Sequence, residues 1–405
     1  MRPAATPRPE VTEQVTQLRT TRLAILNNFI PPYWKPVFAS LSERYPKLRV
    51  FVSTPMEPNR AWNVDWQGLD VVLQKTLTLR GKWRHPKGFA EPLFIHLPID
   101  TIAQLGRFQA DVVLSAEMGF RTLLALLYRK LHPHTRLLIW AEISESSEQG
   151  RGISRHLLRR FFARRADAFI VFGNSGARYV KTFQVPASKI FKIPYATDVD
   201  RFGRNPLTRT QQQARRWLFV GQLIERKGLL PFLNVLVRWM SAHPACAIEF
   251  VVAGDGPLRD DLQRFVRPAN LKLELVGNVS YAEMPRLYAD SGVFIFPTLA
   301  DTWGLVVNEA MASGLPVLGS VYSQAVEMLV SEGENGWTFR PDNAEQTYQA
   351  IHRCLNTPPQ ASQLMRERAR ASAVRQTPEH VAALIDDAVA ACLDPVSLQR
   401  RTRVR

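Results

Sequence analysis

Cysteines and long apolar runs are scarce in this sequence. The three cysteines, Cys246, Cys354 and Cys392, stand far apart and show no spacing typical of a metal site. We therefore expect buried thiols in a reducing compartment. No apolar stretch approaches the ~18 residues that a membrane-spanning helix needs, and the segment before Arg22 lacks the apolar core of a signal peptide. A cytoplasmic enzyme is the default expectation.

Acidic residues are too few to balance the basic ones. The 405 residues include 52 Lys and Arg against 36 Asp and Glu, which gives a net charge of +16. Residues 1–200 hold 29 basic and 16 acidic side chains, whereas residues 201–405 hold 23 and 20. The excess in the first half indicates an anionic partner such as lipid, nucleic acid or an acidic glycan, and it does not bear on the fold.

The chain is too long for one ordinary core and suits two domains of about 200 residues each. In the first half, apolar strand patterns alternate with helix patterns, which predicts an α/β fold with a parallel sheet. The expected strands are residues 22–27, 48–52, 111–114, 137–140, 168–171 and 191–194. In such sheets ligands bind beyond the carboxyl ends of the strands. We expect residues 1–20 and 400–405 to be loosely held.

The segment around residues 295–320 is the most informative one. A buried strand is expected to end at Phe296, a helix to begin near Gly304, and Gly314-Leu-Pro316 to end that helix. Asp301 and Glu309 flank the helix start, where free N–H groups and the positive dipole end favour a phosphate. The two carboxylates would then bind hydroxyls of a ribose and a sugar. The alternative for both acids is compensation of the helix dipole together with solvation.

Asp301-x7-Glu309 resembles the Glu-x7-Glu signature of the retaining GT-B glycosyltransferases of the group 1, glycogen-synthase-like family, with Asp in place of the first Glu. Residues 217–228 are similar to the family's strand, loop and helix start, including Gly221 and Lys227-Gly228. The resemblance implies an α/β GT-B fold of two Rossmann-like, doubly wound domains facing a cleft. Residues 1–200 would bind the acceptor and residues 201–376 the nucleotide sugar. Residues 377–405 would form a helix returning to the first domain plus a basic tail.

By the same resemblance, a set of residues in the second half is expected to bind the donor. Lys227 would neutralise the diphosphate, Glu309 would bind the ribose and Asp301 the transferred sugar. Gln222 stands where the family usually has Arg and brings no charge, so whether Arg226 compensates stays open. The expected donor-binding residues are Gly221, Gln222, Arg226, Lys227, Gly277, Asn278, Val279, Asp301, Thr302, Trp303, Gly304, Leu305 and Glu309.

Loops that follow the strands of the first half carry the acceptor-side candidates. Asn28 and Tyr33 belong to a first loop without glycine, which we interpret as an acceptor wall. Glu117 precedes a helix start, and helix capping is the alternative for it. Glu142 directly follows a strand and is expected to orient the acceptor or act as a base, with a solvated loop acid as the alternative. The expected catalytic residues are Lys227, Glu142 and Asp301.

Two basic stretches lie in the first half. Residues 80–87 mix cations with Trp83 and read as a loop. Residues 151–165 place an apolar line, Ile153, Leu157, Phe161 and Phe162, at helical spacing with a cationic border. One interpretation is a helix packed on the core with a solvated face. The other is docking on an anionic membrane through Arg155, Arg159, Arg160 and Arg164.

The expected function is transfer of a sugar from a nucleotide-diphosphate donor, a UDP-sugar being slightly favoured, to a glycan, lipid-linked or other acceptor. The resemblance implies retention of configuration without a metal or other cofactor. Asp198-x-Asp200 matches a metal-binding pattern of a different transferase class, but its surroundings resemble the segment by which GT-B proteins leave their first domain.

Localisation would be cytoplasmic, with membrane association at the inner face left open. The alternatives are a nucleotide-sugar epimerase and a nucleic-acid-binding protein. No nucleic acid is expected, because exposed aromatics beside the cations are limited to Trp83.

Overall fold

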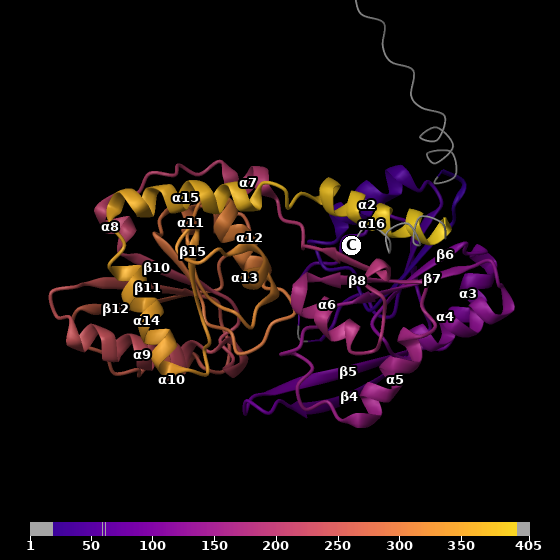
Figure 1. Cartoon of the computed structure of the whole chain (residues 1–405), viewed down its shortest axis with the longest axis horizontal. Helices are drawn as coiled ribbons and strands as arrows, with labels where there is room; N and C mark the ends of the chain where they lie inside the picture. The colour runs from indigo at the N-terminus through magenta and orange to yellow at the C-terminus, as the bar shows by residue number, and fades with distance from the viewer. Residues whose placement is uncertain (1–18, 59, 61, 395–405) are drawn as a thin grey trace, which may run out of the picture.

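The computed structural model describes residues 19–58, 60 and 62–394 and contains two parallel sheets (Figure 1). The first sheet has seven strands in the order β3-β2-β1-β6-β7-β8-β9. Its strands are β1 (Leu23–Asn27), β2 (Leu48–Val52), β3 (Val71–Leu73), β6 (Val112–Ala116), β7 (Arg136–Ala141), β8 (Ala168–Phe172) and β9 (Ile190–Ile193). Strand order reverses between β1 and β6, which is where such sheets bind ligands. The strands expected from the sequence in this half are confirmed.

The second sheet has six strands in the order β12-β11-β10-β13-β14-β15. They are β10 (Arg216–Val220), β11 (Ile248–Ala253), β12 (Leu271–Gly277), β13 (Val293–Phe296), β14 (Val317–Ser320) and β15 (Gly336–Phe339). This is the strand order of a dinucleotide-binding fold, and its reversal lies between β10 and β13. Both strands lead directly into the expected donor residues. The sheet therefore places residues 221–228 beside residues 297–304.

Helices connect the strands and cover both sheets. In the first half they are α2 (Lys35–Arg44), α3 (Thr101–Phe108), α4 (Phe120–Leu131), α5 (Ile153–Ala163), α6 (Gly173–Lys181), η1 (Ala187–Lys189) and α7 (Val199–Gly203). In the second half they are α8 (Gln211–Ala214), η2 (Glu225–Lys227), α9 (Leu229–Ala242), α10 (Arg259–Gln263), α11 (Met284–Ala289), α12 (Leu305–Ala312), α13 (Gln324–Leu329), α14 (Ala344–Leu355), α15 (Pro359–Ala373) and α16 (Pro378–Leu393). The parallel strands need these crossovers, because a short turn cannot join two strands that run the same way.

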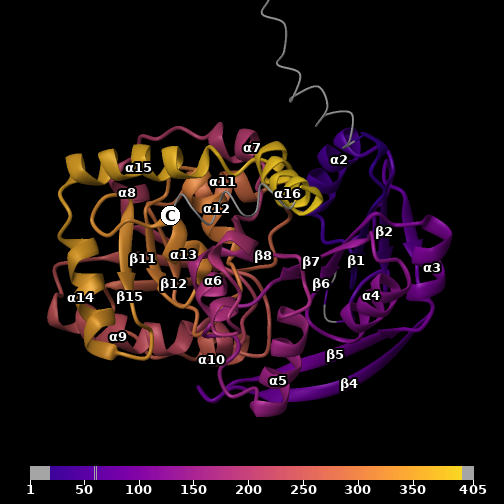
Figure 2. The ribbon, with the colours of Figure 1, turned by 45° about the vertical axis from the view of Figure 1, so that its right-hand side comes forward.

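Helix α16 belongs by sequence to the end of the chain but packs against the first half. It contacts α2 and strands β7, β8 and β9, and both views place it beside α2 (Figures 1 and 2). Asp386 of α16 accepts hydrogen bonds from Arg44, at 3.1 Å, and from the Tyr45 hydroxyl. Val381, Ile385 and Val389 are fully buried along this contact. The helix therefore ties the last described residues to the first sheet.

The sequence interpretation of residues 80–87 as a loop is wrong. A two-stranded antiparallel hairpin, β4 (Thr76–Arg84) and β5 (Ala90–Pro98), extends along one edge of the first half. Leu77 faces Leu97 and Leu79 faces Ile95 in its register. Alternation of polar and apolar residues over positions 76–79 was the strand signal, and the cations that follow it obscured the signal.

Helix α5 forms where an amphipathic helix was expected, but its apolar line faces outward. Ile153 is 79% exposed, and Leu157 and Phe161 are exposed as well, whereas Phe162 is buried. The interpretation of a core-packed helix with a solvated charged face is therefore wrong for most of the line. The expected loose segments, residues 1–20 and 400–405, lie outside the described residues apart from positions 19 and 20.

Candidate active site

Helix α12 begins where the sequence predicted, directly after Gly304. Gly304 has φ 105°, and a Cβ at this position would lie 2.6 Å from the Phe296 ring. A glycine is therefore needed both for the left-handed backbone and for the close approach to β13. The helix ends at Ala312, and β14 starts at Val317 after the Gly314-Leu-Pro316 turn. The strand, loop, helix and strand unit expected from the sequence is confirmed.

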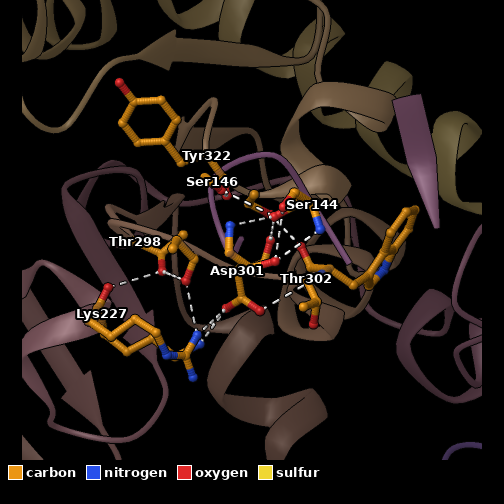
Figure 3. Close-up of polar contacts among 12 residues, drawn as sticks. Ser144, Ser146, Lys227, Thr298, Asp301, Thr302 and Tyr322 are labelled. Atoms are coloured by element: carbon orange, nitrogen blue, oxygen red, sulfur yellow. Dashed lines mark hydrogen bonds and ion pairs between the residues drawn. The ribbon is translucent and has the colours of Figure 1, made fainter. Parts of the chain in front are cut away.

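Asp301 lies at the centre of a cluster of charges ahead of this helix (Figure 3). Its Oδ2 atom is 2.6 Å from Lys227 Nζ and 3.3 Å from Arg226 Nη1. Burial favours the neutral acid, but attraction to Lys227 and Arg226 outweighs it and lowers the pKa of Asp301 to about 2. Asp301 is thus a carboxylate at neutral pH. Two cations and one carboxylate converge where an anionic ligand would meet the start of α12.

Arg226 and Lys227 both reach this cluster although they are adjacent in the chain. The short helix η2 (Glu225–Lys227) turns the backbone so that both side chains point toward Asp301. Arg226 Nη1 also donates to the Ala300 carbonyl at 3.0 Å, and its Nε atom pairs with Glu91 of the hairpin. Gln222 is exposed. A second cation is therefore available beside Lys227, although Gln222 brings none.

Glu309 lies in the interior of the second half. It is 7% exposed, and its Oε2 atom accepts a hydrogen bond of 2.9 Å from the Tyr288 hydroxyl. Burial raises the pKa of Glu309 to about 7, and the Tyr288 bond opposes part of that rise. The two acids of the motif therefore have different surroundings: Asp301 is paired with cations, and Glu309 is bonded to a phenol. This burial rules out the alternative of a solvated acid for Glu309.

Gly228 closes the loop that positions Lys227, and we predict that it cannot be replaced. Its φ is +67°, and a Cβ would lie 2.1 Å from the Pro297 carbonyl oxygen. We expect Gly228→Ala to lower the free energy of unfolding by about 2 kcal/mol or more, through left-handed strain plus this clash. Gly333 is the matched control, because its φ is +74° and a Cβ would meet nothing within 4 Å. Thermal unfolding of both variants measures the difference, and equal losses would contradict the role of the Pro297 contact.

The remaining donor candidates follow strands of the second sheet. Gly221 directly follows β10, and the Gly277 carbonyl accepts from Gly254 N at 2.7 Å just before Asn278 and Val279. Thr302 and Leu305 flank the Gly304 turn. The Trp303 side chain is 1% exposed, stacks on Tyr195 and donates to Asn308 at 2.9 Å, so only the backbone of Trp303 is placed to meet a donor. Its backbone N–H instead points to Asp301 Oδ1 at 3.5 Å.

Asn28 and Glu117 meet at the strand-order reversal of the first sheet. Asn28 Nδ2 donates to Glu117 Oε1 at 3.1 Å. Glu117 does not cap α4, because the helix has Gly119 at its N-cap and no side-chain cap bond, so the capping interpretation is wrong. Glu117 also has φ 68°, a left-handed conformation that few non-glycine residues adopt.

Glu142 and Tyr33 lie in a cluster of aromatic side chains near this reversal. Trp140 Nε1 donates to Glu142 Oε1 at 3.1 Å, and Tyr33 stacks on Tyr195 with 5.4 Å between ring centroids. Burial raises the pKa of Glu142, while hydrogen bonds from Trp140 and Tyr195 oppose the rise. The interpretation of Glu142 as a solvated loop acid is therefore wrong. Tyr195 in turn stacks on Trp303 of the second half, which links the acceptor-side and donor-side candidates.

Sequence reasoning missed the residues that join the two halves at the site. Ser144 Oγ donates to the Asp301 carbonyl at 3.5 Å, and Ser146 Oγ donates to the Tyr322 carbonyl at 3.2 Å (Figure 3). Gln324 Nε2 donates to the Ile143 carbonyl at 3.0 Å. The only sequence signal was the serine-rich loop after β7. These bonds place the loop that carries Glu142 against the loop that carries Asp301.

The hairpin also reaches the second half at this point. Lys87, in its turn, donates to the Leu299 carbonyl at 3.3 Å and lies over the Tyr322 ring, with 3.2 Å to the centroid. Glu91 pairs with Arg226. The hairpin of the first half thus closes one side of the Asp301 cluster, and the Glu91 carboxylate occupies one face of the Arg226 guanidinium.

The described part of the chain contains neither a cluster of metal ligands nor a helix that could span a membrane. Among residues 19–58, 60 and 62–394, no group of three or more His, Cys, Asp and Glu side chains is placed to hold a metal. Asp198 caps α7 through a 2.9 Å bond from Arg201 N. No helix in these ranges combines the length and the apolar character that crossing a membrane requires.

Comparison with known proteins relates this site to a large group of enzymes. Residues 214–357 match the family model described as glycosyl transferases group 1. The sulfoquinovosyl transferase of Arabidopsis thaliana is 26% identical over 63% of the chain and 51% of the relative. The alpha-D-kanosaminyltransferase of Streptomyces kanamyceticus is 23% identical over 43% of the chain and 47% of the relative. The matches thus span about half the length of these curated relatives.

Solved structures agree with the whole described fold. Anabaena HepE in complex with UDP superposes with a TM-score of 0.67 at 14% identity, covering 92% of this chain and all of HepE. The lipopolysaccharide outer core galactosyltransferase WaaB gives a TM-score of 0.68 at 12% identity, covering 91% and 98% of the two chains. These identities establish the fold alone. The predicted α/β architecture of two parallel-sheet halves is confirmed.

Proposed function

Because residues 214–357 form a group 1 glycosyl transferase domain on a GT-B fold, we propose that this protein transfers a sugar from a nucleotide-diphosphate donor to a glycan or lipid-linked acceptor. The observation that carries the proposal is the convergence of Lys227 and Arg226 on Asp301 just ahead of α12. One relative is named an alpha-monoglucosyldiacylglycerol synthase and another is named for colanic acid biosynthesis, and these names support this class of acceptor.

Departure of the nucleotide diphosphate places developing negative charge on the phosphate oxygens. Fixed cations and backbone N–H groups stabilise such charge most when they are already oriented and shielded from water. Lys227, Arg226 and the N–H groups of Thr302 to Leu305 are the donors proposed for this task. Without donor, Asp301 compensates the two cations. With donor bound, the diphosphate would take over Lys227 and leave Asp301 to accept a hydroxyl hydrogen of the transferred sugar.

The two cations would supply the charge compensation that other transferases take from a metal ion, and we propose a metal-independent reaction on this ground. Family resemblance supports retention of configuration. Gly277, Asn278 and Val279 are proposed to line the base, and Glu309 to bind the ribose. A UDP-sugar is the proposed donor, since the HepE structures are complexes with UDP, with UDP and glucose, and with UDP-glucose.

On the acceptor side, Glu142 is proposed to take the proton of the attacking hydroxyl. A carboxylate with a raised pKa is a better base at neutral pH than a solvated one. Asn28, Tyr33 and Glu117 are proposed to position the acceptor at the strand-order reversal of the first sheet. A lipid-linked acceptor would place the protein at the cytoplasmic face of a membrane.

A donor panel tests this proposal. We expect one UDP-sugar to raise the melting temperature, because a ligand at a hundred times its Kd stabilises the native state by about 2.7 kcal/mol. Differential scanning fluorimetry with UDP-, GDP- and ADP-sugars identifies base and sugar together. The positive hit is then incubated with protein, and released UDP is measured with and without acceptor. No shift with any nucleotide sugar would overturn the proposal.

A further inference from the structure

Two helices and the hairpin on one side of the first half turn apolar side chains to solvent. Leu123, Leu127 and Leu131 stand at successive fourth positions of α4, and Leu131 is 67% exposed. Ile153, Leu157 and Phe161 do the same on α5. Residues four apart share one helix face, so each helix presents an outward apolar stripe. Exposed apolar surface this extended in a soluble domain marks an interaction site.

The hairpin adds a third apolar surface beside the two helices. Leu77, Leu79 and Ile95 are exposed and share one face of the hairpin. Helix α4 packs against β5, and the Arg151 guanidinium before α5 lies over the Trp83 ring of β4, with 3.4 Å to the centroid. Both ribbon views group α4, α5, β4 and β5 on the same side (Figures 1 and 2). We call these exposed residues of α4, α5 and the hairpin the outer apolar face.

Helix α5 is inverted relative to an ordinary surface helix. Arg159 points inward and is neutralised, because it is 3% exposed and pairs with Glu148. Arg155 lies 3.3 Å from the same carboxylate, but its side chain is 39% exposed. The expectation that Arg159 binds lipid is therefore wrong, whereas the expectation for Arg155 stays a prediction. The helix uses ion pairs to hold its polar side against the protein, and its apolar side remains free for a partner.

The outer apolar face is bordered by cations, and its two helices carry no acidic residues. Neither α4 nor α5 contains Asp or Glu. The exposed cations beside the apolar stripes of the helices are Lys130, Arg164 and Arg165. Arg80, Lys82 and Arg84 are exposed as well, but they alternate with Leu77 and Leu79 and therefore point to the other face of the hairpin. The one acid of the hairpin strands, Glu91, is paired with Arg226. Apolar side chains bordered by cations match a lipid monolayer, where acyl chains lie below anionic headgroups.

We propose that the outer apolar face docks on a membrane that contains anionic lipid. Leucine, isoleucine and phenylalanine side chains enter the headgroup region, and the bordering cations contact lipid phosphates. Docking here brings α4 and the hairpin, which flank the acceptor-side candidates, next to the bilayer. The acceptor is then a lipid whose sugar or hydroxyl group projects from the surface. The identity of the acceptor rests on the proposed function, whereas the docking itself does not.

Vesicle co-sedimentation tests the proposal. We expect the full chain to sediment with phosphatidylglycerol-rich vesicles and much less with phosphatidylcholine vesicles. The double variant Leu127→Asp, Leu157→Asp should bind anionic vesicles on the order of tenfold less or weaker still, since it removes two of the exposed apolar contacts. Arg164→Glu should weaken binding several-fold. The matched controls are Val266→Asp and Arg264→Glu, because Val266 and Arg264 are exposed in the second half.

Equal sedimentation of the double variant and the wild type would overturn the proposal, as would absence of wild-type binding to anionic vesicles. Size-exclusion chromatography covers the competing occupant, a second copy of the chain. A wild-type dimer that the double variant converts to monomer would overturn lipid docking. The variant should keep the wild-type thermal shift with donor. Loss of vesicle binding with that shift retained separates this proposal from the transferase proposal.

Discussion

Replacing Lys227 with alanine is expected to lower kcat/KM for the donor by about 30-fold to 900-fold. The range corresponds to the 2–4 kcal/mol that a single preorganised group contributes to stabilising developing charge, at about 1.4 kcal/mol per tenfold. Lys227 Nζ lies 2.6 Å from Asp301 and is 13% exposed, so its charge acts in a shielded site. Burial lowers the pKa of Lys227 and Asp301 opposes that fall. We expect the loss mainly in kcat, because the phosphate charge grows as the bond breaks.

The Lys227 measurement needs a control for the fold and one for charge. Arg226 stays 3.3 Å from Asp301 in the variant, so the carboxylate keeps a partner. Lys272→Ala removes a lysine of the same domain whose side chain is 69% exposed and should leave turnover unchanged. Lys227→Arg should recover part of the rate if charge is what matters. Turnover by Lys227→Ala at the wild-type rate would remove Lys227 from the mechanism.

The strands and most helices could be predicted because runs and periodic patterns of apolar residues indicate which segments are buried. Residues 23–26, 112–114 and 168–172 are continuous apolar runs, as expected for strands covered on both faces. The hairpin could not be predicted in the same way. Its strands are half exposed and carry Arg80, Lys82 and Arg84, so neither burial nor a clean alternation marked them.

The meeting of the loops that carry Lys227 and Asp301 could be predicted because its signals are local. Gly304, Asp301 and the Lys227-Gly228 pair each follow a strand at short range, and the sheet brings the two loops together. Contacts between the halves could not be predicted. Ser146, Gln324 and Lys87 act across more than 140 residues of sequence, and nothing in the local pattern of a serine or a glutamine indicates a partner that distant.

The sequence also could not predict which side of an amphipathic helix faces the protein. The Ile153, Leu157 and Phe161 line has the spacing of a helix packed on a core, and spacing alone does not say which side faces the protein. The arrangement is decided by Glu148, whose carboxylate pairs with Arg155 and Arg159 on the inner side. A buried acid outside the helix therefore determines how the helix is turned.

Glu309→Gln is expected to make stability less dependent on pH and to raise it at alkaline pH. Burial raises the pKa of Glu309 from 4.5 to about 7, so the native state holds a proton that the unfolded chain has released between these values. Native stability is therefore highest below about pH 4.5 with respect to this group and falls as pH rises through 7. The difference of about 2.5 pKa units corresponds to about 3 kcal/mol. Glutamine keeps an oxygen for the Tyr288 hydroxyl and never ionises.

Thermal unfolding at pH 5 and pH 8 measures this effect as a difference between variant and wild type, which cancels other titrating groups such as the histidines. Because part of the difference is already lost at pH 5, about 2.5 kcal/mol falls between the two pH values. We expect the variant to gain roughly 5–10 °C over the wild type between them, at about 2–4 °C per kcal/mol for a domain of this size. Glu345→Gln, at a side chain 61% exposed, should show no such gain. If Glu309 binds the ribose as a carboxylate, wild-type affinity for UDP rises as pH increases through 7, because the site must release its proton first. A pH-independent difference in melting temperature would show that Glu309 is already ionised in the native state.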